Sequence, residues 1–199
     1  MQSNKTLKMA QMAILIAIIL VMAFTPIGYL RTGGLEISLI TIPVAIGAMI
    51  LGPAAGALFG GIFGITSFYQ CFGLSPFGAT LLGINPVATF LVCVPTRILM
   101  GFLTGWITKL ILKLDKTNTV SYFVGGAIAA LLNTLFFMST LMLFFGNSDY
   151  IQSMNPEGLS VVLFVAMFVG INGLLEVPAT CIAGGTVSKA LAKMLKTQA

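Results

Sequence analysis

Long apolar runs, separated by short stretches rich in Gly, Pro and polar residues, dominate the pattern of this chain. A helix of about 20 apolar residues is long enough to cross a bilayer. The pattern predicts a compact all-α bundle that forms a single transmembrane domain over 1–199. Its six membrane-spanning helices are expected at roughly 7–28, 38–51, 54–72, 86–112, 120–145 and 159–195. The Gly-, Ser- and Pro-rich stretch 71–86 is predicted to be a long loop, either an ordinary connection or one that partly re-enters the membrane.

Composition supports a membrane protein. Of the 199 residues, 58% are hydrophobic and 8% are charged, whereas soluble domains average about 25% charged residues. A soluble domain of this length has no core large enough to bury so much apolar surface. The composition therefore excludes the soluble classes and predicts a protein embedded in the lipid bilayer.

Basic residues gather near both ends of the chain and after the fourth predicted helix. They are Lys5, Lys8, Lys109, Lys113, Lys116, Lys189, Lys193 and Lys196. Six crossings place all of them on one side, and the bias of Lys and Arg toward cytoplasmic loops puts both termini in the cytoplasm. This distribution indicates topology rather than nucleic-acid binding. The apolar stretch after Lys8 is too long for a signal peptide, so we expect a retained first helix.

Small residues recur at helical spacing. Gly52, Gly56, Gly60 and Gly64 repeat at a spacing of four and predict one smooth face on the third helix, and Gly101 and Gly105 predict a similar face on the fourth. Such faces let helices approach closely in lipid, so we expect packing inside the bundle.

Ala13 and Ala17 form a similar face on the first helix. This face serves either internal packing or docking of another membrane protein. Cys71, Cys93 and Cys181 lack the spacing of metal or redox motifs and are expected to be packing residues.

Motifs of catalysis are absent from the sequence. There is no G-x-x-x-x-G-K-[ST] phosphate loop, no H-E-x-x-H and no histidine at all. The chain is therefore not expected to hydrolyse ATP, hold a metal or cofactor, or act as an enzyme.

Three polar residues lie at one depth within the predicted helices. At about 1.5 Å per residue, Arg97, Asn133 and Glu176 stand about 18–20 Å from the cytoplasmic boundary. This is just outward of the middle of an apolar core about 30 Å thick. Asn172 lies about one helical turn further out, on the face of Glu176. A charge at this depth costs roughly 2.5–3.5 kcal/mol, so it needs a partner, a cavity or a function.

Two compatible interpretations follow. Arg97 and Glu176 can form an ion pair whose hydrogen bonds Asn133 completes. Alternatively, the same groups form the floor of an outward-facing cavity with Asn172 on its wall. Pro95 removes a backbone donor at this depth, and interrupted helices often line binding cavities. We predict that these four polar residues bind a small ligand.

The outer loops supply further candidates for ligand binding. Tyr29 and Arg31 lie in the Gly-containing loop after the first helix, and Asn85 lies at the end of the loop 71–86. These loops are either a lid over the ligand or ordinary connections.

Three stretches carry a resemblance to a known family: LEISLITIPVAIGAMILGPAAGALFGGIFGITSF (35–68), INPVATFLVCVPTRILMGFLTGWI (84–107) and NTLFF (133–137). The chain resembles the S components of energy-coupling factor (ECF) vitamin transporters over essentially its whole length. Ala13 and Ala17 match the small-residue docking motif of that family. The resemblance implies a subunit of the bacterial cell membrane that captures a vitamin with high affinity. It also implies docking on a coupling module of one transmembrane scaffold protein and two cytoplasmic ATPases that bind ATP.

Within the family, the stretch 35–68 and SFYQ (67–70) resemble pantothenate-specific S components. Pantothenate is a small anion with an amide and two hydroxyls. Arg97 or Arg31 suits the anion, and Asn133, Asn172 and Asn85 suit the amide and hydroxyls. Glu176 is then expected to hold Arg97 in position. The alternatives are another vitamin (folate, riboflavin or a pyridoxine-like ring) and a membrane scaffold protein that transports nothing.

Overall fold

The structure is a computed structural model, which describes residues 2–32, 35–115, 119–153, 160, 163, 166 and 173–197. Helices predominate, with one small β-hairpin. The named elements are α1 (Gln2–Ala23), η1 (Pro26–Gly28), β1 (Tyr29–Thr32), β2 (Leu35–Ser38), α2 (Thr41–Leu51), α3 (Pro53–Gln70), α4 (Pro76–Ile84), α5 (Pro86–Leu112), α6 (Val120–Phe145), α7 (Asp149–Ser153), the π-helical segment η2 (Thr180–Gly184) and α9 (Gly185–Thr197). Residues 173–179 are also helical and lead into η2.

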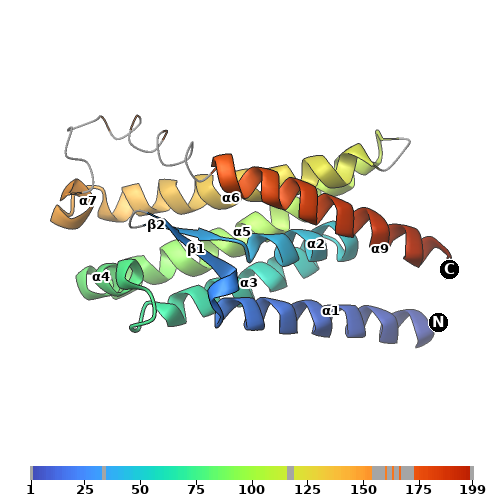
Figure 1. The fold of residues 1–199 in the computed structure, drawn as a ribbon, viewed down its shortest axis with the longest axis horizontal. Helices are drawn as coiled ribbons and strands as arrows, with labels where there is room; N and C mark the ends of the chain where they lie inside the picture. Colours follow the sequence, from blue (N-terminus) through green and yellow to red (C-terminus); the bar gives the residue numbers. More distant parts are fainter. Residues whose placement is uncertain are drawn as a thin grey trace.

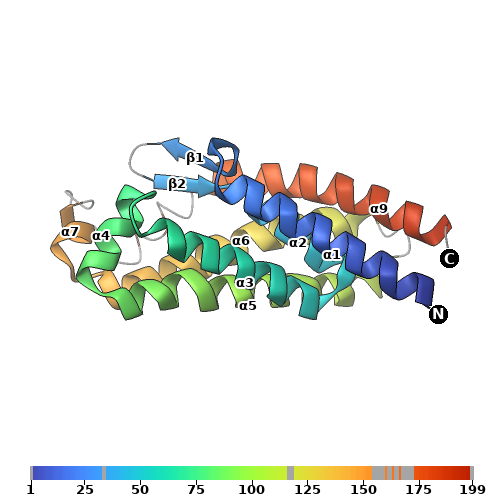
Figure 2. The same ribbon diagram turned by 90° about the horizontal axis from the view of Figure 1, so that it is seen from below.

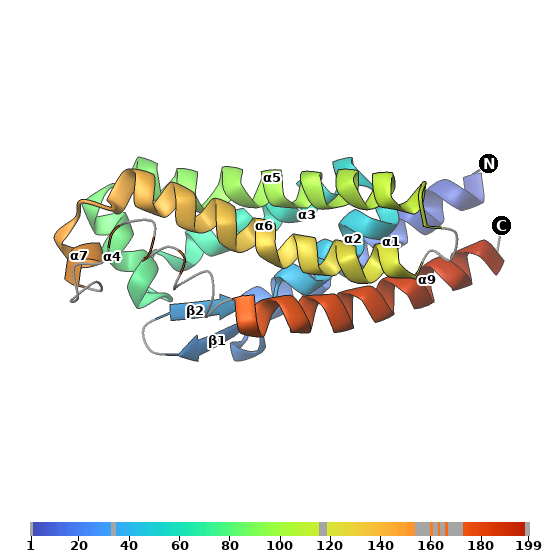
Figure 3. The same ribbon diagram turned by 90° about the horizontal axis from the view of Figure 1, so that it is seen from above.

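The long helices lie side by side along one axis (Figure 1). The start of α1 and the end of α9 lie at the same end of the bundle as the end of α5, and α4 and α7 lie at the opposite end (Figures 2 and 3). The helix ends that carry Lys5, Lys109 and Lys193 therefore share one end of the molecule. Which side of the membrane this end faces stays a prediction.

Three described helices are long and apolar enough to cross a membrane: Lys5–Ala23, Pro86–Leu112 and Val120–Phe145. The apolar helix Thr41–Leu51 is shorter. The number of six crossings stays a prediction, since much of the sixth predicted helix lies outside the described residues.

The observed bounds of α5 and α6 match the predicted ranges 86–112 and 120–145. The first helix ends earlier than predicted, at Ala23. Thr25 precedes Pro26 and has extended backbone angles, φ −120° and ψ 156°, because the proline ring disfavours a helical conformation in the residue before it. The chain then enters the β1–β2 hairpin, in which Tyr29 pairs with Ser38. The sequence pattern did not predict this hairpin.

The prediction of a long loop over 71–86 was wrong, because the stretch contains α4. Ser75 caps this helix: its Oγ accepts a hydrogen bond from the N–H of Gly78 at 3.1 Å. Pro76 occupies the first helical position, where its missing N–H costs nothing and its fixed φ favours the helix. Ser75 and Pro76, two of the residues on which the loop prediction rested, therefore begin a helix.

The predicted glycine faces pack against each other, so that prediction is confirmed. A Cβ on Gly56 would overlap the carbonyl of Gly101, and a Cβ on Gly60 would overlap the carbonyl of Arg97. Gly105 approaches the backbone of Pro53 in the same way. Gly52 is different: it has open space around it and φ +94°, and it ends α2. The backbones of α3 and α5 thus touch directly at the depth of Arg97.

Apolar side chains flank this contact on two sides. One cluster joins α1, α2 and α3 around the fully buried rings of Phe59 and Phe63. A second joins α4, α5 and α6 around Leu81, Val92 and Leu141. Polar side chains gather in the space between the two clusters.

Candidate functional site

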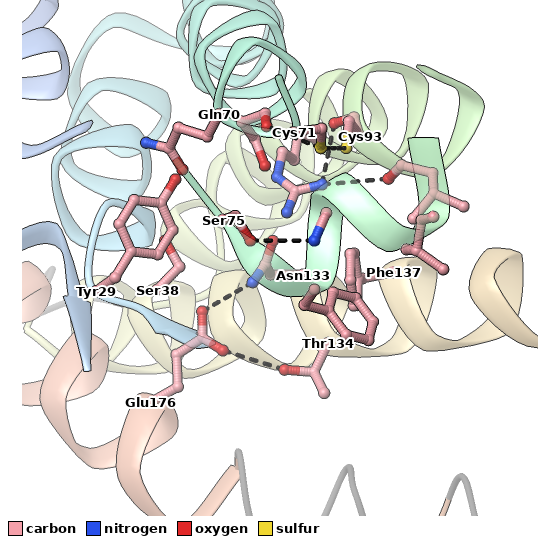
Figure 4. Close-up of a pocket in the computed structure, with 16 residues that line it drawn as sticks. Tyr29, Ser38, Gln70, Cys71, Ser75, Cys93, Asn133, Thr134, Phe137 and Glu176 are labelled. Atoms are coloured by element: carbon pink, nitrogen blue, oxygen red, sulfur yellow. Dashed lines mark hydrogen bonds between the residues drawn. The ribbon is translucent and has the colours of Figure 1, made fainter. Parts of the chain in front are cut away.

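A cavity lies among α3, α4, α5, α6, the β-hairpin and the helical segment 173–179 (Figure 4). The volume open to the centres of water molecules in this cavity is about 80 Å³. A single water needs only about 10–15 Å³ of such volume. Its polar lining residues are Tyr29, Ser38, Ser67, Gln70, Cys71, Ser75, Cys93, Arg97, Asn133, Thr134 and Glu176. Phe77, Leu81, Val92 and Phe137 supply apolar walls.

Arg97 reaches the cavity from α5 with only 7% of its surface exposed. Helical side chains point toward the helix N-terminus, and its Nη1 donates to the carbonyls of Val92 and Cys93 at 3.1 and 3.0 Å. The guanidinium also lies over two rings, 4.7 Å from the centroid of Phe63 and 5.2 Å from that of Phe137. Such cation–π contacts and carbonyls stabilise the cation without neutralising it.

Glu176 reaches the cavity from the segment 173–179 and is 2% exposed. Its Oε1 accepts hydrogen bonds from Thr41 Oγ1 at 2.6 Å and from Asn133 Nδ2 at 2.9 Å. Its Oε2 accepts one from Thr134 Oγ1 at 3.1 Å. Thr41 is the first residue of α2, so the carboxylate also faces the positive end of that helix dipole. Three donors and a helix terminus thus surround this buried carboxyl group.

The predicted pairing of Arg97 with Glu176 was wrong. Both residues line the cavity, but no salt bridge or hydrogen bond joins them in the part of the chain that the structure describes. Sequence spacing predicted the depth of each of these residues along its helix. Which side chains meet at that depth depends also on how each helix is rotated about its own axis. Backbone carbonyls and rings hold Arg97, and donors from α2 and α6 hold Glu176. Arg97 therefore keeps its charge available.

Of the other predicted ligand-binding residues, some line the cavity and some do not. Tyr29 lines the cavity. Asn85 does not: it is exposed and caps α5, accepting a hydrogen bond from the N–H of Ala88 at 3.1 Å. The Arg31 side chain and Asn172 lie outside the described residues, although the backbone of Arg31 pairs with Glu36 in the hairpin.

Sequence reasoning missed Thr41, Thr134 and Gln70. Thr134 had a signal, since it follows Asn133 directly. Thr41 and Gln70 stand at the ends of apolar runs and resembled ordinary boundary residues. Gln70 Nε2 donates to the carbonyl of Ala23 at 2.5 Å and thereby links the end of α3 to the end of α1.

The prediction that the cysteines are packing residues holds for Cys71 and Cys93 in that both are buried. They belong to an apolar cluster with Val94. Their sulfur atoms lie 4.0 Å apart at the edge of the cavity. Cys181 is half-buried.

The Glu176 cluster allows a direct test by substitution. Glu176→Gln keeps the shape of the side chain but removes the charge that its hydrogen-bond donors stabilise, and its amide nitrogen cannot accept the hydrogen bond that Thr134 donates to Oε2. We expect a loss of stability of about 1–3 kcal/mol, measured as a lower thermal unfolding temperature in detergent. Thr134→Val is the matched control, since it removes one donor and leaves the carboxylate with two; its effect should be smaller. Equal stability of wild type and Glu176→Gln would contradict this description.

A buried cation, an amide, several hydroxyls and aromatic walls form a site for a small polar organic anion. Among the described residues, no group of three His, Cys, Asp or Glu is placed to hold a metal ion. The fold and site thus define a helical membrane protein with a polar cavity between its helices that suits a small molecule.

The family is shown by direct comparison. Residues 7–183 match the model of the ECF transporter, substrate-specific component. The chain belongs to this family, whose members are substrate-binding subunits of transporters and not enzymes.

Two relatives extend this result. The pantothenate transporter PanT of Leuconostoc mesenteroides is 29% identical over 192 residues, which cover 90% of this chain and 92% of that protein. The solved structure of ThiT from Listeria monocytogenes superposes with a TM-score of 0.65 over 96% of this chain and 97% of that one. Its sequence identity is 18%, so the likeness supports the fold alone.

Proposed function

We propose that this chain captures pantothenate as the substrate-binding subunit of an ECF-type ABC importer in the bacterial plasma membrane. The observation that carries the proposal is Arg97, a buried cation on the cavity wall that no described carboxylate neutralises. Such a group attracts a small anion strongly, because the low local dielectric strengthens the interaction. The similarity to PanT supports pantothenate as that anion.

The rest of the cavity suits the other groups of pantothenate. Asn133 and Ser75 offer amide and hydroxyl groups to its hydroxyls and amide, and Phe137 offers an apolar wall to its methyl groups. Tyr29 and Ser38 bring the β-hairpin to the same cavity. The fixed charge of Arg97 favours pantothenate over uncharged vitamins such as riboflavin.

In the proposed assembly, partner proteins rather than this chain supply the energy for transport. Both termini lie in the cytoplasm of a six-span protein, the cavity opens outward, and a coupling module of a transmembrane scaffold protein and two ATPases drives release. No cofactor is required by this chain.

Purified protein tests the proposal. Small molecules that co-purify with it are identified by mass spectrometry, and radiolabelled pantothenate is then bound in competition with folate, riboflavin and pyridoxine. We expect saturable pantothenate binding that the other vitamins do not displace. Displacement by one of them, or its recovery from the purified protein, assigns a different vitamin to the cavity.

Ala13 and Ala17 are proposed to form the docking surface for the coupling module. Both are exposed on α1, and only 11% of the span Lys5–Ala23 is buried. Ala17→Leu adds bulk to this open face and is expected to stop uptake by cells while the purified subunit binds pantothenate normally. Leu143→Trp, on an exposed position of α6, is the control and should leave uptake intact. Normal uptake by Ala13→Leu and Ala17→Leu would exclude this surface from docking.

A further inference from the structure

The amide of Asn133 has a fixed orientation. A carboxylate only accepts hydrogen bonds, so the amide must present Nδ2 to Glu176, as it does at 2.9 Å. Its Oδ1 is thereby directed away from Glu176. This oxygen is buried and has no hydrogen-bond partner, and Asn133 as a whole is 9% exposed. A buried acceptor without a donor is costly, so the site is complete only when a ligand supplies one.

Arg97 is restrained in a similar way. Nη1 donates to the carbonyls of Val92 and Cys93, and the central carbon of the guanidinium lies over the rings of Phe63 and Phe137. Nε is buried without a partner, and no described group accepts from Nη2. The Nε–Nη2 edge remains, and this edge matches the two oxygens of a carboxylate.

The guanidinium of Arg97, from α5, lies near the amide of Asn133, from α6. The guanidinium lies over Phe137, and Asn133 is one helical turn earlier on the same helix, about 6 Å away along its axis. Both line the same cavity (Figure 4). One small ligand can therefore reach both groups.

We infer that the cavity binds its ligand in one orientation. The Nε–Nη2 edge of Arg97 binds the carboxylate of the ligand. Asn133 Oδ1 accepts a hydrogen bond from a hydroxyl of the same ligand, several bonds away from the carboxylate. This inference rests on the proposed function and adds to it the orientation and the substrate class, a hydroxylated monocarboxylate. In pantothenate, the hydroxyl end faces Asn133 and Glu176. A dicarboxylate is rejected, because its second charge would meet the acceptor Oδ1 with the Glu176 carboxylate directly behind it.

The orientation is tested by measuring the binding of three ligands to the wild type and to two variants. The ligands are pantothenate, its alcohol analogue (CH2OH in place of the carboxylate) and its analogue with hydrogen in place of both hydroxyls. Dissociation constants are measured for wild type, Arg97→Gln and Asn133→Leu in detergent. For wild type, each analogue should bind about 10- to 100-fold more weakly than pantothenate, the range for one or two hydrogen bonds of this kind.

The variants should each lose one selectivity and keep the other. Arg97→Gln should bind the acid and the alcohol about equally but still prefer the hydroxylated ligand. Asn133→Leu should lose the preference for hydroxyls but still prefer the acid. The retained selectivity also shows that each variant is folded. Where Asn133→Leu does not fold, Asn133→Ser takes its place, because it keeps a small hydroxyl and removes the amide oxygen.

The opposite pattern overturns the inference. If Arg97→Gln still binds the acid more tightly than the alcohol, Arg97 does not recognise the carboxylate. If Asn133→Leu still binds the hydroxylated ligand more tightly, Asn133 does not recognise the hydroxyls. Failure of the proposed function looks different: wild type then does not bind pantothenate at all. In that case a panel of other hydroxylated monocarboxylates and their alcohols is tested, and absence of any preference for the acids overturns the inference as well.

Discussion

Arg97→Gln is expected to weaken pantothenate binding by about 100-fold or more, since it removes two hydrogen bonds to a charged group, worth together about 3 kcal/mol. The guanidinium is the only cationic side chain on the cavity lining that the structure describes. Glutamine retains polarity and approximate length but has no charge. Equilibrium binding of radiolabelled pantothenate to the purified protein measures the effect.

Two controls separate binding from folding. Lys109→Gln removes a positive charge from the exposed last turn of the same helix and should leave the dissociation constant unchanged. Arg97→Lys keeps the charge but cannot present two parallel N–H groups, so we expect an intermediate loss. Thermal unfolding confirms that each variant is folded. A folded Arg97→Gln protein with the affinity of wild type would remove the basis of the proposed function.

Gly60→Ala is expected to destabilise the protein by about 1–3 kcal/mol, the usual cost of overpacking. This corresponds to roughly 2–10 °C in unfolding temperature for a chain of this size. The added Cβ would overlap the backbone carbonyl of Arg97, which cannot move without separating α3 from α5. Because the contact lies at Arg97 itself, pantothenate binding should fall together with stability.

Gly61 offers a matched control one residue away. A Cβ on Gly61 would lie 3.5 Å from the side chain of Ile98, an ordinary van der Waals contact. Gly61→Ala should therefore unfold within about 0.5 kcal/mol of wild type, as most surface substitutions do. Equal unfolding temperatures for Gly60→Ala and Gly61→Ala would contradict the close packing of α3 on α5.

Much of this fold could be predicted because strong local signals define it. The bounds of α5 and α6 follow from long, predominantly apolar runs between polar ends. Glycines at a spacing of four predicted packing inside the bundle, since few other residues allow such a close approach, but that α3 and α5 pack against each other is seen only in the structure. Counting along the helices also identified Arg97, Asn133 and Glu176, which the structure brings to one cavity.

The remainder depends on tertiary contacts that spacing does not encode. The charge on Glu176 suggested Arg97 as its partner, but Thr41, Thr134 and Asn133 are closer to it in the folded chain. Asn85 was ambiguous because the same residue type begins helices and contacts ligands. The β1–β2 hairpin is too short and irregular in pattern to be distinguished from a loop.

A structure of the purified protein with bound pantothenate tests the central claim most directly. We predict that the ligand occupies the cavity of Figure 4, with its carboxylate oxygens at hydrogen-bond distance from Nε and Nη2 of Arg97 and a hydroxyl on Asn133 Oδ1. Pantothenate bound elsewhere, for example in a second hollow lined by Phe24, Pro26 and Leu74, with Arg97 not in contact with the ligand, would contradict the account.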